Sequence, residues 1–295
     1  MKIGIDLGGT KTEAILIDNS GSELFRKRIK TEKNYQGTIK GVKTLIKEIE
    51  SSFGKISSIG IGMPGIVSND TSLVKNANSI WLNGNPLKKD LEKELNREIK
   101  IENDANCFAL SEAVDGAGKD YNTIFGVIIG TGTGGGIIIN KKILQGHNQI
   151  GGEWGHTPLP NRTDEEKKYA KKCFCGLKGC METYVSGPGF SYIFNAKYNE
   201  NLDSFQIIEK SYEGDKRALK SLQNYVDHLA RGLSNVVNIL DPEVIIFGGG
   251  MSNIKYIYEN INIKLKQYVV SDTLHTKVFK NHHGDSGGVR GAAWL

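Results

Sequence analysis

Short apolar runs interrupted by glycine alternate along this chain with longer stretches in which apolar residues recur at helical spacing. Lys2–Leu7 and Glu13–Ile17 are apolar and flank Gly8-Gly9-Thr10. β-Branched residues suit a pleated sheet and glycine suits tight turns, so this stretch is predicted to be a β-hairpin. Thr123–Asn140 repeats the design around Gly130–Gly136. Two such hairpins, one near the start of each half, predict a duplicated fold that closes on one ligand.

The remaining chain alternates predicted strands with predicted helices, which is typical of an α/β protein. Apolar runs predict strands at Ile56–Met63, Ile99–Glu102 and Val244–Phe247. Apolar residues at helical spacing predict helices at Tyr35–Phe53, after Pro86, and at Cys107–Ala113, Phe190–Tyr198, Phe205–Tyr212, Asp215–Leu240 and Ile254–Val270, with a short one at the C-terminus.

Composition indicates an ordinary soluble protein of two domains. The 295 residues are 38% hydrophobic and 24% charged, and the formal net charge of +5 is spread along the chain without a concentrated basic run. This distribution makes no case for nucleic acid as a partner. No apolar run approaches membrane-spanning length and no signal peptide is evident, so no membrane partner is expected and the cytoplasm is the expected location. Four cysteines in that compartment favour thiols or metal ligands over disulfides.

The two glycine hairpins offer free backbone N–H groups and threonine hydroxyls, which suit phosphate oxygens. Gly130-x-Gly132-x-x-Gly135 and Gly60-x-Gly62-x-x-Gly65 match the dinucleotide-binding pattern, but that pattern needs a following helix. Ile137–Ile139 continues as strand and Pro64 interrupts the other match, so both are treated as accidental. A P-loop also fails, because Thr10 precedes Lys11 where glycine is required. Each hairpin alone is equally well explained as a tight turn; the pair favours phosphate binding.

Asn103 and Asp104 lie where a predicted strand ends and a predicted helix begins. The simple interpretation is a helix cap, because these residue types accept the free N–H groups of a first turn. Their place after the carboxyl end of a strand, between the two glycine hairpins in the chain, favours a functional role instead. Both interpretations stay open at this point.

Three cysteines within eight residues, Cys173, Cys175 and Cys180, are interleaved with glycines and preceded by His156. This Cys₃His set predicts a structural zinc site, with a redox pair or free thiols as the alternatives. Four protein ligands leave no open coordination position, so the metal would hold shape. Tying His156 to the cysteine loop would also bring Glu153 and Glu182 near one another, although each alone is an ordinary surface acid. Farther along, Gly248-Gly249-Gly250 follows a buried strand and offers either a flat surface for a nucleotide or a close-packed turn.

Taken together, these motifs resemble those of the ROK sugar kinases of the actin-like ATPase superfamily, from end to end of the chain. The matching segments are Asp6–Lys11, Glu102–Asn106, Gly130–Gly136, Glu153-x-Gly155-His156, Cys173-x-Cys175-Gly176-x-x-Gly179-Cys180-x-Glu182 and Gly248–Gly250. The resemblance implies an actin-like ATPase (ribonuclease H-like) α/β fold with two domains around a cleft. The expected domains are residues 1–116, to which 280–295 return, and residues 117–279.

The resemblance also implies ATP-dependent phosphorylation of the primary hydroxyl of a hexose. Asp104 would be the general base, and sugar hydroxyls would be held by Asn103, Asp104, Glu153, His156 and Glu182. Residues flanking the phosphates would be Gly8, Gly9, Thr10, Lys11, Gly130, Thr131, Gly132, Thr133 and Gly134. Gly248, Gly249 and Gly250 would border the adenosine, Asp6 would act near Mg²⁺, and His156 would also bind Zn²⁺. A homodimer is implied by the resemblance alone.

Within the family, Val74–Gly84 and Gly152–His156 look most like bacterial fructokinase of the manno(fructo)kinase type. Fructose is therefore the expected substrate, with mannose or glucose as further ones, and N-acetylglucosamine kinase is the alternative. A sugar-responsive repressor of the same family would carry an N-terminal DNA-binding extension, whereas the first strand is expected to begin at Lys2. A chaperone-like or filament-forming ATPase of the same fold is disfavoured by the Cys₃His loop and the Asn103-Asp104 pair.

Overall fold

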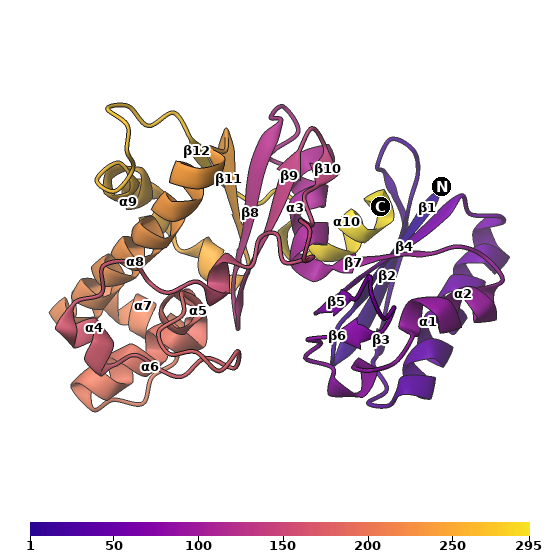
Figure 1. The fold of residues 1–295 in the computed structure, drawn as a ribbon, viewed down its shortest axis with the longest axis horizontal. Coiled ribbons are helices and arrows are strands. Elements are labelled where there is room, and N and C mark those ends of the chain that lie inside the picture. The colour runs from indigo at the N-terminus through magenta and orange to yellow at the C-terminus, as the bar shows by residue number, and fades with distance from the viewer. The chain divides into compact units, whose positions relative to one another are not determined.

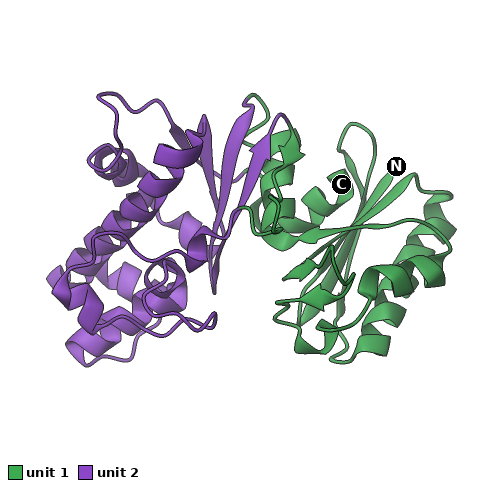
Figure 2. Cartoon of the chain, viewed as in Figure 1, with its two compact units in different colours: residues 1–120, 141–151, 282–295 green, residues 121–140, 152–281 purple.

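The computed structural model describes all 295 residues and divides the chain into two compact units (Figure 2). Unit 1 comprises Met1–Asp120, Lys141–Gly151 and His282–Leu295, and unit 2 comprises Tyr121–Asn140 and Gly152–Asn281. The segment 141–151, which the sequence analysis assigns to the second domain, is therefore grouped with unit 1. No helix is long and apolar enough to cross a membrane.

Unit 1 is built on a five-stranded sheet in the order β3-β2-β1-β4-β7. The strands are β1 (Lys2–Leu7), β2 (Lys11–Ile17), β3 (Glu23–Lys30), β4 (Ser58–Met63) and β7 (Lys100–Asn103). β1 to β3 form an antiparallel meander, and β4 and β7 run parallel to β1. The short pair β5 (Ile66–Val67) and β6 (Val74–Lys75) forms a separate ribbon. Because β1, β4 and β7 are parallel, their carboxyl ends share one edge of the five-stranded sheet.

Helices α1 (Tyr35–Phe53) and α2 (Leu87–Leu95) lie side by side in unit 1 (Figure 1). Their apolar side chains belong to its main core. Helices α3 (Asp104–Val114) and α10 (Gly287–Trp294) pack on each other, and α10 also packs on β1 and β4. That contact is close: a Cβ added to Gly4 of β1 would lie 2.1 Å from Val289 O, and one added to Gly60 of β4 would lie 1.9 Å from Ala292 O. The glycines at these positions let the C-terminal helix lie directly on the sheet.

Unit 2 contains the strands β9 (Thr133–Ile139), β8 (Thr123–Ile129), β11 (Val244–Gly248) and β12 (Lys277–Lys280), adjacent in that order. β8 and β9 are the antiparallel arms of the second glycine hairpin, and β11 runs parallel to both β8 and β12. A short strand, β10 (Lys142–Ile143), follows β9 in the chain.

The core of unit 2 is formed between its sheet and a group of helices. The long helix α8 (Lys216–Leu240) begins after the cap Asp215, whose side chain accepts from the N–H groups of Arg217 and Ala218. Its apolar stripe packs beside α9 (Lys255–Leu265) and α7 (Ser204–Tyr212). Shorter helices are α4 (Asp164–Lys168), α5 (Glu182–Val185) and α6 (Gly187–Tyr198).

Most of the predicted elements form, and the structure contains further ones. The strands β3 and β12, the short strands β5, β6 and β10, and the short helices α4 and α5 were not predicted. β3 alternates charged outward residues with Phe25 and Ile29, so its pattern is that of an edge strand with one solvated face. The hairpin glycines Gly8, Gly9, Gly130 and Gly132 do not adopt positive φ. At these positions glycine leaves the backbone without a side chain. Gly249 differs, because its φ is 83° and a Cβ there would lie 2.6 Å from Ile129 O.

Candidate active site

In unit 1, three carboxylates gather where the sheet meets α3. Asp6 stands in register with Glu13 on the neighbouring strand, and Asp104 is the first residue of α3. Burial, followed by the negative charges of Asp104 and Glu13, raises the pKa of Asp6 to about 7. Glu13 is itself nearly buried and ion-paired with Arg26 and Arg28. Glu13 was not among the predicted site residues, and its only signal in the sequence is an acid in an otherwise apolar strand.

The donor set fits a hard divalent cation such as Mg²⁺, which prefers carboxylate oxygens. The negative charge of Asp104 is close enough to disfavour ionisation of Asp6, and a cation there would offset that repulsion. Asp6 also lies beside the backbone of Gly288, where an added Cβ would be 3.8 Å from its Oδ2. Asp6 is thus the residue in unit 1 whose surroundings suit a metal-bound phosphate.

The structure shows that the Asn103-Asp104 pair begins helix α3 and that Asn103 caps it. Asn103 is the N-cap of α3, since its Oδ1 accepts from the N–H groups of Ala105 at 2.9 Å and Asn106 at 3.4 Å. Its Nδ2 donates to Gly65 O at 3.3 Å. Asp104 Oδ1 accepts from the N–H of Ala105 at 2.8 Å. Burial raises the pKa of Asp104 despite this hydrogen bond, which makes its carboxylate a stronger base.

The first glycine turn closes through the N–H of Gly8, which donates to Lys11 O at 3.1 Å. Thr31 supports the turn: its hydroxyl donates to Gly8 O at 2.8 Å and its N–H donates to Thr10 O at 2.9 Å. The side chains of Thr10 and Lys11 are exposed. The turn therefore presents a hydroxyl and an ammonium group to solvent on a braced backbone.

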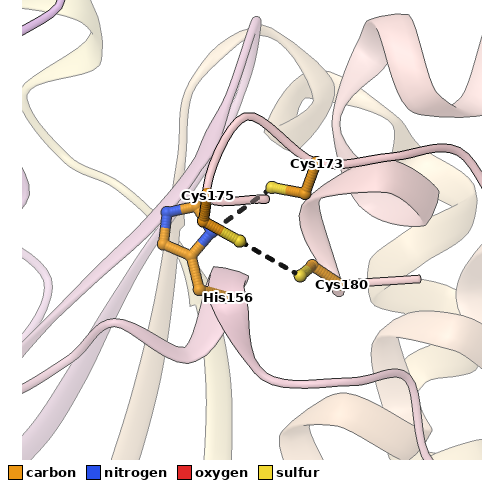
Figure 3. A group of neighbouring side chains, drawn as sticks. All are labelled: His156, Cys173, Cys175 and Cys180. Atoms are coloured by element: carbon orange, nitrogen blue, oxygen red, sulfur yellow. Dashed lines mark hydrogen bonds between the residues drawn. The ribbon is translucent and has the colours of Figure 1, made fainter. Parts of the chain in front are cut away.

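In unit 2, the structure brings His156, Cys173, Cys175 and Cys180 together (Figure 3). Their ligand atoms all lie within 4.8 Å of one another, with Cys173 Sγ 3.5 Å from His156 Nδ1 and Cys175 Sγ 3.6 Å from Cys180 Sγ. Tetrahedral zinc with bonds of about 2.3 Å would space its ligands by about 3.8 Å. The four residues therefore fit zinc closely, and none of them pairs as a disulfide.

Glu153 and Glu182 each lie near a different residue of this cluster. Glu153 Oε2 is 3.8 Å from His156 Nε2, the ring nitrogen that faces away from the cysteines. Glu182 Oε1 is 3.7 Å from Cys173 Sγ. A carboxylate on the outer nitrogen of a metal-binding histidine fixes the ring's tautomer and orientation. The cluster thus connects both acids through its own ligands.

The second and third glycine segments lie near each other in unit 2. A Cβ added to Gly130 would lie 3.8 Å from Gly250 N, and the N–H of Gly187 donates to Gly130 O at 2.8 Å. Thr133 Oγ1 is buried and has no hydrogen-bond partner. A buried hydroxyl without a protein partner, next to a glycine turn, is suited to a polar ligand such as a phosphate oxygen.

An aromatic residue that the sequence analysis did not single out lies beside the third glycine segment. Phe205, near the start of α7, is 59% exposed, and its Cζ lies 3.4 Å from the position of a Cβ on Gly250. A large exposed ring next to bare backbone is the arrangement on which a nucleobase can stack. In the sequence, Phe205 could only be assigned to the apolar side of a helix.

This chain is similar to known proteins over its whole length. A family model described as the ROK family matches residues 2–295. An N-acetyl-D-glucosamine kinase of Vibrio parahaemolyticus is 38% identical over 301 residues, which cover 100% of this chain and 99% of that protein. One from Yersinia pseudotuberculosis is 38% identical over 299 residues, covering 100% and 98%.

Solved structures show the same fold. A ROK hexokinase from Thermus thermophilus superposes with a TM-score of 0.88 at 26% identity, covering 99% of this chain and 97% of that one. A ROK family glucokinase from Streptomyces griseus, solved with glucose and AMPPNP, gives 0.80 at 27% identity, covering 100% and 98%. The expected actin-like ATPase fold is confirmed. The expected fructokinase type is not, because the curated relatives described above are N-acetyl-D-glucosamine kinases.

Proposed function

The chain belongs to the ROK family, and on that premise we propose that it is an ATP-dependent kinase that phosphorylates the 6-hydroxyl of a hexose. The observation that carries this proposal is the environment of Asp104. Its half-buried carboxylate stands at the start of α3, with a raised pKa and with Asp6 close by. A base placed next to a cation-binding acid is what phosphoryl transfer to an alcohol requires.

Asp104 would accept the proton of the sugar hydroxyl as its oxygen attacks the γ-phosphate. A positioned base is typically worth about 10²–10⁴-fold in rate. The first turn of α3 adds to this, because its N–H groups and helix dipole hold the carboxylate in one orientation. Most of the remaining rate enhancement would come from positioning of the two substrates, since phosphoryl transfer needs little covalent chemistry from the protein.

Each unit has its own residues that are proposed to bind ATP or Mg²⁺. In unit 1 these are Asp6 for the metal and Gly8 to Lys11 for phosphate oxygens. In unit 2 they are Gly130 to Gly134 for phosphate, Gly248 to Gly250 for ribose or base, and Phe205 for stacking. Mg²⁺ held by Asp6 would offset charge on the transferring phosphoryl group.

For the sugar, we propose N-acetylglucosamine as the first substrate to test, since the curated relatives over the full length of the chain act on it. Asn103, Glu153, His156 and Glu182 are the proposed hydroxyl ligands. Zinc in the Cys₃His cluster would support the last three, because it would fix His156 and the segment that leads to Glu182.

Fructose is the second candidate, favoured by the resemblance of Val74–Gly84 to fructokinases. In the structure this loop is held by its own contacts. Asn83 Oδ1 accepts from Ala77 N at 2.9 Å, and Trp81 Nε1 donates to Thr38 Oγ1 at 3.0 Å. Trp154 is buried and donates to Gly134 O at 2.9 Å. Both indole N–H groups are thus used by the fold, and polar side chains are the proposed determinants of sugar choice.

The test is kcat/KM for N-acetylglucosamine, fructose, mannose and glucose with ATP and Mg²⁺. Hexose sites that pair hydroxyls with buried polar groups reject the wrong analogue strongly, so one sugar should exceed the others clearly. A preference for fructose would favour the second candidate over the first. If none of the four is phosphorylated above background, the proposed function is wrong.

A further inference from the structure

Glu112 is a completely buried carboxylate that the proposed reaction does not use. It lies two turns beyond Asp104 on α3, is 0% exposed, and forms no ion pair. Four hydrogen bonds from backbone N–H groups compensate its charge instead. Ala117 donates to Oε2 at 2.9 Å, His282 to both oxygens at 3.0 and 3.1 Å, and His283 to Oε1 at 3.1 Å.

The donors of these bonds are located next to places where the chain leaves or enters unit 1. The chain passes from one unit to the other after residues 120, 140, 151 and 281. Ala117 precedes the first of these crossings by a few residues, and His282 is the first residue after the last. A single carboxylate on α3 therefore fixes the unit 1 end of two crossings.

Lys141 fixes a third crossing in a similar way. It is the first residue of unit 1 after the crossing at residue 140. Its ammonium donates to three backbone carbonyls, those of Ala113 at 2.8 Å, Gly118 at 3.3 Å and Lys119 at 2.5 Å. Ala113 is the neighbour of Glu112 at the C-terminal end of α3. Two adjacent positions on one helix thus hold three of the four crossings by contacts that lie entirely within unit 1.

A charge buried against backbone dipoles alone is costly unless the geometry is complete, so it marks a place where position is fixed closely. The helix held there is rigid over its eleven residues and begins with Asp104. Phosphoryl transfer is sensitive to such positions, because a displacement of about 1 Å at the reacting atoms can cost on the order of 10²-fold in rate.

We propose that Glu112, assisted by Lys141, is a positioning residue for the reaction: it fixes α3, and with it Asp104, to the chain crossings. The inference rests on the proposed kinase function. A displaced Asp104 would activate the sugar hydroxyl less well while ATP stays bound, so water would take a larger share of the phosphoryl groups. The diagnostic quantity is therefore the ratio of ADP formed to sugar phosphate formed.

The test compares wild type, Glu112→Gln and Lys141→Met with a stability control, Leu91→Ala, in the full-length protein. Glutamine presents an NH₂ group where two N–H donors need an acceptor. Leu91 is 0% exposed on α2, in the core of unit 1, and its truncation lowers stability without altering the contacts of Glu112. Each variant is assayed with saturating ATP and the best hexose of the four above, and its thermal midpoint is measured.

For Glu112→Gln and Lys141→Met we expect kcat to fall about 10–100-fold while KM for the sugar and for ATP changes little, and the ADP to sugar phosphate ratio to rise above 1. Leu91→Ala should lower the thermal midpoint but keep the ratio at 1. If Glu112→Gln does not fold, Lys141→Met decides the matter. A ratio of 1 with unchanged kcat in the folded variants would overturn the proposal, whereas a wild type without kinase activity would overturn the proposed function itself.

Discussion

Glu182 Oε2 accepts a hydrogen bond from the backbone N–H of Thr133 at 3.1 Å. The other oxygen of the same carboxylate lies 3.7 Å from Cys173 Sγ. Glu182 therefore connects the second glycine hairpin to the Cys₃His cluster through one side chain. A change in the cluster should therefore alter both Glu182, a proposed sugar ligand, and the proposed phosphate-binding turn at Thr133.

The first prediction concerns metal content. Freshly purified protein should contain one zinc per chain by elemental analysis. Cys175→Ser should lower zinc affinity by at least about 10–100-fold and raise KM for the sugar, because His156 and Glu182 lose their support. Cys107→Ala is the matched control, since Cys107 is a buried thiol of α3 outside the cluster and should leave zinc unchanged. Wild-type protein without zinc would refute the site.

The second prediction concerns the base. Asp104→Asn should lower kcat by about 10²–10⁴-fold and leave the Kd for the sugar within a few-fold, because the amide keeps the shape and the Ala105 hydrogen bond but accepts no proton. Sugar binding is measured by calorimetry and turnover by ADP release. Full activity in this variant would remove Asp104 from the proposed role.

The third prediction concerns the nucleotide. Phe205→Ala should raise KM for ATP about 5–30-fold, corresponding to about 1–2 kcal/mol of stacking, with kcat little changed. Tyr212→Ala is the matched control, because Tyr212 is a similarly exposed ring at the far end of the same helix. Equal values of KM for ATP in the two variants would show that Phe205 does not contact the base.

The fourth prediction concerns acid stability and the C-terminal helix. Asp115 accepts from His283 Nε2 at 2.9 Å, from Arg290 Nε at 2.8 Å and from Trp294 Nε1 at 3.1 Å. Burial by itself would raise the pKa of Asp115, but the bonds from His283 and Arg290 outweigh it and bring the pKa to about 2.

Because the folded pKa is below that of the unfolded chain, Asp115 stabilises the fold above pH 4 and loses this effect as the pH falls toward 2. The contribution at neutral pH is about 2 kcal/mol. Asp115→Asn should lower the free energy of unfolding by about that amount at pH 7 and show a shallower decline between pH 4 and 2 in urea titrations. An unchanged slope would contradict the assignment.

The local patterns of the sequence were sufficient for much of the fold. Apolar spacing located α1 at Tyr35–Phe53 and both glycine hairpins, because helical and strand periods are properties of the local chain. β3 and β12 were not predicted, because edge strands carry polar residues and are stabilised by pairing with a neighbouring strand. The Cys₃His cluster was predicted from spacing alone, since short loops leave few ways to arrange three cysteines.

The sequence by itself thus determined most of the longer elements, the hairpin turns and the candidate metal ligands, and it left the capping role of Asn103 as one of two interpretations. Only the tertiary structure decided that Glu13 stands beside Asp6, that Phe205 lies against Gly250, and that Glu112 holds His282 from 170 positions away. The physical reason is that these relations depend on sheet register and helix packing. Both are set by burial of the whole core, which no short window of sequence contains.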